Sequence, residues 1–264
     1  MWGSADYLGG RLSRRRHVLV VLGGTQAVGL VAMVIAATVT GAWGAPTAYV
    51  GWAVLASLSG ATGLALYYRA LAIGTMGVVS PIAALGVLVP LTAGLAQGEQ
   101  PAPLQVAGIV LALVGVIAAS GPEVHGEAGW APVLLAGGAA VFLGTSLLAI
   151  ARGSEYSTIM TMTVMRAVTV SVLLVLALAT RHRVSITSGE VPWFVAVGLL
   201  DVGANVAFGM ASTLGMLSLV SVFGSLYPVA TILLARWLDH ERMRPIQVLG
   251  VVLALTGVAV IAAG

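Results

Sequence analysis

The chain has few of the residues on which a water-soluble protein depends. Only 8% of its 264 residues are charged, and lysine is absent, so that all 12 basic residues are arginine. A soluble domain carries about 25% charged residues, because its surface must face water. This shortage of charge excludes an ordinary soluble enzyme, a nucleic-acid-binding domain and a disordered chain.

Cysteine is also absent, which excludes a disulfide framework, a thiol nucleophile and a thiolate metal site. The four histidines lie in loops or at the ends of apolar runs and have no ligand spacing. The sequence contains no metalloprotease, nucleophile-elbow, P-loop or dinucleotide-binding motif. We therefore expect no enzyme, no resident metal and no cofactor.

Apolar residues, by contrast, make up 59% of the chain, and 34 residues are glycine. Long unbroken apolar runs are typical of membrane helices, since the strands of a barrel would alternate over about ten residues. A span takes about 20 residues, so the length allows about nine to eleven spans. Nine full runs are visible, at His17–Thr40, Ala48–Tyr68, Thr75–Ala96, Pro103–Ser120, Trp130–Ala151, Thr158–Thr180, Val191–Ser212, Leu217–Trp237 and Pro245–Ala263.

An internal repeat divides the chain into two halves. Residues 103–116 and 245–258 are identical at ten of fourteen positions, and Ser80, Gly86 and Pro90 align with Ser218, Gly224 and Pro228. The first repeat is assigned to residues 1–121, the linker to 122–129 and the second repeat to 130–264. The repeat offset predicts that residues 1–10 are the end of a first helix whose start is missing.

Five helices in each half predict an inverted arrangement, because an odd number of spans turns the second half upside down. The expected fold is an all-α polytopic membrane protein with two inverted five-helix repeats and a truncated first helix. Inverted repeats of this kind build many secondary transporters. Arginines near the ends of the runs favour a cytoplasmic side by ten to one, which places the loops 1–2, 7–8 and 9–10 there.

Short motifs recur in the same order in both halves. They are Ala-Leu-Tyr-Tyr-Arg-Ala-Leu at 65–71, Ser80-Pro81, Pro90, Gly98-Glu99 and Gln105-Val-x-Gly108, followed by Pro228, Glu241 and Gly250. Together with Trp2-Gly3-Ser4, this pattern resembles the EamA domain of the drug/metabolite transporter superfamily. The resemblance implies a ten-helix transporter with a central cavity that moves small metabolites or amphipathic compounds. It also implies that both termini are cytoplasmic, whereas the arginine bias, which we follow, places them outside.

Two charged residues lie inside apolar runs, where each costs about 2.5–3.5 kcal/mol on insertion scales. Asp201 shares one helix face with Asn205 and Phe208, at spacings of four and seven residues. Arg166 lies in the preceding run, and the two depths differ by only about 4 to 5 Å at 1.5 Å per residue. We expect the two charges to pair, either as part of a substrate or proton site or as a structural salt bridge.

Other candidates for the substrate path lie near the ends of runs. Asp6 is either a site residue or an interfacial charge paired with Arg11 or Arg14. Aromatic side chains either stack on an organic substrate or form an interfacial belt; these are Trp2, Tyr7, Tyr67 and Tyr68.

Serine and proline mark two kinked helices. Ser218, Ser221 and Ser225 share a face ahead of Pro228, and proline leaves free carbonyl groups that contact substrate or only permit packing. Glycine pairs seven residues apart, Gly108/Gly115 and Gly250/Gly257, predict close packing of the fifth and tenth helices.

The sequence therefore predicts a monomeric secondary transporter of small organic molecules in the cell membrane, as a permease or exporter. Its partners would be the solute and the bilayer, with proton coupling through Asp201 or Asp6. A lipid flippase of the same fold and a non-transporting membrane scaffold are the alternatives.

Overall fold

A computed structural model describes residues 1–13, 16, 18–73, 79, 82–119, 130–180, 187–238 and 244–264. Within these ranges the chain is helical and contains no strand, as the apolar runs predict. The predicted linker at 122–129, Ser80-Pro81 and Glu241 lie outside the described residues.

The described helices fall into two compact units. Unit 1 comprises Met1–Leu58 and Ala149–Met210, and unit 2 comprises Ser59–Leu148 and Ala211–Gly264. The units do not follow the two repeats, since each takes helices from both. All three points at which the chain passes from one unit to the other lie inside helices: α3 (Tyr49–Ile73), α7 (Trp130–Ala179) and α8 (Val191–Leu214).

Unit 1 is built on α1 (Trp2–Ser13), α2 (Val18–Thr40), the second half of α7 and most of α8. Leu12, Val20, Val21 and Phe194 form one of its buried apolar clusters. Gly198 brings α8 close to α2, because a Cβ there would lie 2.6 Å from the carbonyl oxygen of Thr25. Short 3-10 turns occur at η1 (Ala42–Gly44) and η3 (Ser188–Glu190).

The fifth and sixth full runs, expected to be separate helices, are two helices that meet at a kink and together make up the 50-residue α7. Only Ser157 departs from helical geometry, with φ −167° and ψ 108°. Its side-chain oxygen accepts a hydrogen bond from the backbone N–H of Met160 at 3.2 Å. One extended residue and one side-chain cap therefore replace the predicted loop.

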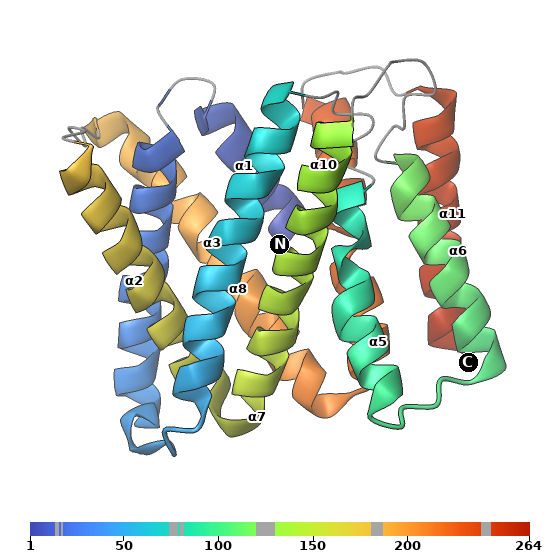
Figure 1. Ribbon diagram of the computed structural model, residues 1–264, viewed down its shortest axis with the longest axis horizontal. Coiled ribbons are helices and arrows are strands. Elements are labelled where there is room, and N and C mark those ends of the chain that lie inside the picture. The colour runs from blue at the N-terminus through green and yellow to red at the C-terminus, as the bar shows by residue number, and fades with distance from the viewer. Residues whose placement is uncertain are drawn as a thin grey trace. The chain divides into compact units, whose positions relative to one another are not determined.

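Unit 2 contains η2 (Leu85–Val87), α5 (Leu88–Ala96), α6 (Pro103–Ala119), α9 (Leu217–Gly224), α10 (Tyr227–Leu238) and α11 (Pro245–Ala263). α6 and α11 lie side by side (Figure 1). A Cβ at Gly108 would lie 2.8 Å from the carbonyl oxygen of Gly257, and a Cβ at Gly115 would lie 2.8 Å from that of Gly250. The predicted glycine packing is confirmed, and the pairing runs antiparallel, as expected for equivalent helices of inverted repeats.

The eighth predicted full run, Leu217–Trp237, is two helices instead of one. α9 ends at Gly224 and α10 begins at Tyr227, directly before Pro228. Proline has no N–H to donate to the carbonyl group four residues earlier, which here belongs to Gly224, so a continuous helix would lose that backbone hydrogen bond. The kink that proline predicts is thus a complete break.

Five of the described helical segments are long and apolar enough to cross a membrane: Val20–Thr40, Tyr49–Ala70, Trp130–Ala179, Ser188–Leu214 and Pro245–Ala263. At about 20 residues per span, the 50-residue segment is long enough for two passes. The chain is an all-α, multi-pass membrane protein.

Candidate functional site

The two charges predicted inside the membrane meet in unit 1. Arg166 Nη2 lies 2.9 Å from Asp201 Oδ2. The arginine side chain is only 4% exposed, whereas the aspartate side chain is 27% exposed. The contact that helix depth predicts is therefore present, and the carboxylate is its accessible partner.

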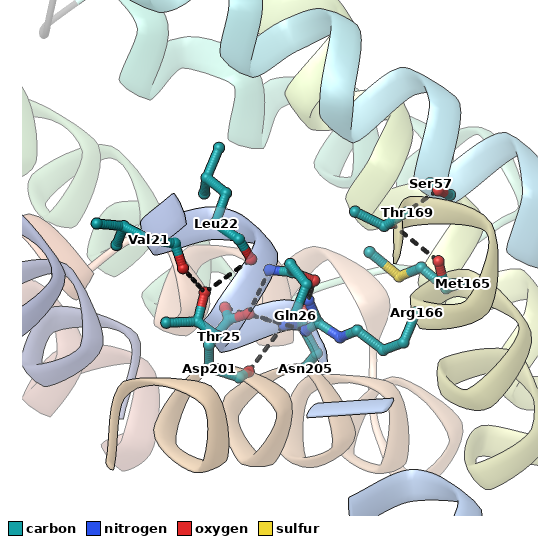
Figure 2. Close-up of polar contacts among 10 residues, drawn as sticks. All are labelled: Val21, Leu22, Thr25, Gln26, Ser57, Met165, Arg166, Thr169, Asp201 and Asn205. Carbon is teal, nitrogen blue, oxygen red and sulfur yellow. Dashed lines mark hydrogen bonds and ion pairs between the residues drawn. The ribbon is translucent and has the colours of Figure 1, made fainter. Parts of the chain in front are cut away.

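Gln26 of α2 completes this pair. Its carbonyl oxygen accepts a hydrogen bond from Arg166 Nη1, and its amide donates to Asp201 Oδ2 at 3.4 Å. Figure 2 shows the guanidinium group reaching in between Gln26 and Asp201. Three helices, α2, α7 and α8, thus meet through one ring of polar side chains, which we call the polar ring (Gln26, Arg166 and Asp201).

Neighbouring residues on the same helices hold the polar ring in place. The Asn205 amide donates to the carbonyl oxygen of Asp201 at 2.8 Å and to Asp201 Oδ1 at 3.3 Å. On α2, Gly29 lies beside the arginine, and a Cβ there would make an ordinary van der Waals contact of 3.6 Å with both Cδ and Nε of Arg166. The predicted face of α8 therefore does carry Asn205 beside Asp201, and both contribute to one network.

Two buried nitrogens of Arg166 form no hydrogen bond among the described residues, and one of them, Nη2, has only its ion-pair contact with Asp201. Among the described residues, Arg166 Nε is buried and has no hydrogen-bond partner. A buried donor without a partner costs about 1–3 kcal/mol, and more when the group is charged. The polar ring therefore keeps a charged group with unused hydrogen-bonding capacity inside an apolar helix bundle.

Aromatic rings and a second carboxylate lie along α1 and α8. The rings of Trp2 and Phe208 have centroids 5.7 Å apart with a tilt of 43°, a favourable aromatic geometry. Asp6, whose side chain is exposed, lies within electrostatic range of Asp201. The structure thus brings Trp2 and Phe208 into contact, and Asp6 interacts with Asp201 electrostatically.

Tyr7 has a different environment from Trp2. It is buried, and its hydroxyl accepts a hydrogen bond from Arg11 Nη1 at 3.2 Å. The guanidinium carbon of Arg11 lies 5.9 Å from the centroid of the same ring. These contacts indicate that Tyr7 anchors an arginine at the end of α1.

The remaining candidates lie in unit 2. Tyr67 and Tyr68 have ring centroids 6.0 Å apart, and Tyr68 is exposed. Ser221 and Ser225 are buried, and each hydroxyl donates to a backbone oxygen of its own segment, that of Leu217 at 2.6 Å and that of Val222 at 2.7 Å. These four residues therefore belong to unit 2, whereas the polar ring belongs to unit 1.

Gln26 is the member of the polar ring that the sequence analysis missed. It is the only amide side chain within the apolar run that became α2, so its position was visible in the sequence. Its two partners lie 140 and 175 residues further along the chain. Among the described residues, no group of three histidine, aspartate or glutamate side chains is placed to hold a metal ion.

Comparison with known proteins gives two findings. The model of the EamA-like transporter family matches residues 1–121 and 130–263. A solved structure titled only "Crystal structure of protein" superposes with a TM-score of 0.80 at 18% identity, covering 99% of this chain and 93% of that one. That likeness shows the fold alone. The comparison with curated proteins finds no match.

Proposed function

Because the chain belongs to the EamA-like transporter family, we propose that it is a secondary transporter that carries small organic solutes by alternating access. The polar ring is the observation that supports this proposal. Charged groups inside membrane helices are costly and typically mark substrate or ion pathways. Here the pair is incompletely satisfied and its carboxylate is partly exposed, so a solute with polar groups has both a donor and an acceptor to contact.

Each residue of the polar ring has a distinct role in this proposal. Asp201 is the acceptor that a solute or water reaches first, because its side chain is 27% exposed. Arg166 offers its unpaired Nε to an acceptor group of the solute. Gln26 exchanges one hydrogen-bond partner for another with little loss of hydrogen-bonding energy, because its side-chain amide both donates and accepts. Trp2 and Phe208 provide aromatic surface for an organic body.

Proton coupling belongs to the same proposal. A proton on Asp201 would remove the charge that holds Arg166, so uptake and release of the proton would open and close the pair. The carboxylate of Asp6, which interacts electrostatically with Asp201, is a second candidate to hold that proton. The proposal therefore expects transport to respond to an imposed pH gradient.

The test combines a binding screen with a transport assay. Purified protein is screened by thermal shift against the twenty amino acids, hexoses and tetraphenylphosphonium, since a ligand that binds only the folded state raises the Tm. Compounds that raise the Tm are then followed in counterflow into proteoliposomes, with and without a pH gradient. We expect accumulation above protein-free liposomes.

Two variants connect transport to the polar ring. Asp201→Asn keeps the shape of the side chain and removes its charge, and we expect a loss of transport of at least about tenfold. Glu155→Gln removes a carboxylate from the exposed Arg152–Glu155 pair and serves as the control, which should transport normally. Full transport by Asp201→Asn would remove Asp201 from the mechanism. Failure of every compound to accumulate would contradict the transport proposal.

A further inference from the structure

Glu99, in the loop between α5 and α6, contacts the start of α9, which lies 118 residues further along the chain. Glu99 Oε1 accepts a hydrogen bond from the backbone N–H of Leu217 at 2.5 Å, and Oε2 accepts one from Ser218 at 2.9 Å. These are the first two residues of α9. The residue before them, Met216, makes no side-chain cap of its own. Glu99 is therefore the N-terminal cap of α9, supplied from another part of unit 2.

The local sequence around Glu99 is built for this contact. α5 ends in a glycine turn, in which Gly98 has φ 92° and donates its N–H to Leu95, while the N–H of Glu99 bonds to the carbonyl group of Gly94. This is the Schellman geometry that ends many helices. It turns the chain at Gly98 and aims the next side chain back along α5.

Gly94 supplies the space that the carboxylate occupies. A Cβ at this position would overlap Oε2 of Glu99 and lie 3.0 Å from the backbone nitrogen of Ser218. In the segment Gly94-Leu-Ala-Gln-Gly98-Glu99, Gly94 leaves space for the carboxylate, Gly98 forms the turn and Glu99 caps α9. In the sequence its two glycines form only an isolated GxxxG pattern.

α9 itself is short and carries buried polar groups. It has eight residues and ends at the break before α10. Ser218 and Ser221 are both 0% exposed, and the Ser218 hydroxyl has no hydrogen-bond partner among the described residues. Val222 of α9 packs in a buried apolar cluster with Leu91 and Ile109, but an isolated helix of this length is unstable, so the start of α9 depends on contacts from the rest of unit 2.

We propose that Glu99 is a clasp between α5 and α9, which holds the start of α9 in the conformation described, and that its release admits water and solute to Ser218 and Ser221. The clasp makes Glu99 a positioning residue, because it acts through α9. The part of this inference that places the release within a transport cycle rests on the proposed function. The clasp itself does not.

Accessibility of single cysteines tests the clasp without any transport assay, since the chain has no cysteine of its own. Ser221→Cys reports on α9, and Ser146→Cys reports on another buried serine of unit 2, in α7. Each is labelled in membranes with a small maleimide, with Glu99 intact and with Glu99→Gln. Glutamine keeps the length of the side chain but presents an amide N–H where the carboxylate accepted a hydrogen bond.

We expect Glu99→Gln to raise the labelling rate at Ser221→Cys by about tenfold, which is the effect of losing a typical helix cap, and to leave Ser146→Cys within twofold. Gln97→Ala, an exposed neighbour in the same loop, should change neither rate. An unchanged rate at Ser221→Cys, or an equal rise at both cysteines, would overturn the clasp.

Hydrogen exchange of the unmodified chain provides a second test if the variants do not fold. First-turn amides of a helix have no partner within that helix. The clasp predicts that Leu217 and Ser218 nevertheless exchange at least about tenfold more slowly than Leu104 in the first turn of α6. Equal exchange at these positions would contradict the proposal. If the clasp is confirmed while no solute is transported, the proposed function fails and the clasp remains.

Discussion

The two units hold their helices together by opposite means. In unit 1, α2, α7 and α8 meet through charged and amide side chains in the polar ring. In unit 2, α6 and α11 meet backbone to backbone, because glycines remove the side chains between them. Close packing of small residues is the usual way in which membrane helices associate. Since the same chain packs α6 against α11 in this way, the ionic contact in unit 1 calls for a reason other than packing.

The largest effect expected from this comparison comes from breaking the ion pair on one side. Arg166→Met leaves Asp201 without its counter-charge; breaking a buried pair costs about 3–5 kcal/mol, and we expect the lower end of that range because the Asp201 side chain is 27% exposed. We expect a large fall in Tm for Arg166→Met. The double variant Arg166→Met/Asp201→Leu should recover much of the loss, because no charge is left unpaired. Equal Tm values for the single and double variants would show that the pair is not coupled.

A smaller but still clear effect is expected in the glycine contact of unit 2. Gly115→Val places a side chain where the backbone of Ala254 lies, and overpacking of this kind costs about 1–3 kcal/mol. The variant should lower both the Tm and the yield of monodisperse protein in size-exclusion chromatography. Gly137→Ala is the matched control, because a Cβ at Gly137 meets nothing within 4 Å. A Tm for Gly115→Val equal to that of the control would mean that α6 and α11 separate without cost.

The smallest effect is expected at the exposed ionic contact of unit 1. Arg16 Nε donates to Glu190 Oε1 at 2.7 Å, and its Nη2 donates to Thr187 Oγ1 at 2.9 Å. Both ionic side chains are partly exposed, and exposed pairs are screened by salt. Arg16→Gln should lower the Tm slightly at low ionic strength and leave it unchanged in about 1 M salt. A decrease in Tm that persists in high salt would contradict this prediction, because it would mean that the Arg16–Glu190 pair is as well shielded from salt as the polar ring.

Helix depth was the part of the site that the sequence could predict. Arg166 and Asp201 lie in adjacent apolar runs, and counting 1.5 Å per residue from a shared membrane face brings them to similar depths. The glycine contact of α6 and α11 was predictable for the same reason, since a spacing of seven residues keeps Gly108 and Gly115 on one helix face. In each case a regular helix converts sequence position directly into spatial position.

Contacts that depend on the register between distant helices were not predictable. Gln26 of α2 meets Asp201 of α8 where Gly198 allows the two helices to approach closely, and the sequence contains no measure of that distance. Glu99 stood out in the sequence only as part of the Gly98-Glu99 motif, and its contact with α9 was hidden because its partners Leu217 and Ser218 offer backbone groups. The break between α9 and α10 was equally unpredictable. Pro228 predicts a kink, but whether the helix ends at Gly224 depends on how the freed backbone groups are hydrogen-bonded.

The places where the chain passes between its units have a mechanical consequence. Leu58 and Ser59, Leu148 and Ala149, and Met210 and Ala211 are the three junctions, and each lies within continuous helix. A loop at such a junction would act as a free swivel. A helix stores elastic energy when it bends. Any displacement of one unit against the other would therefore bend all three helices. The bending stiffness of α3, α7 and α8 therefore resists any such movement.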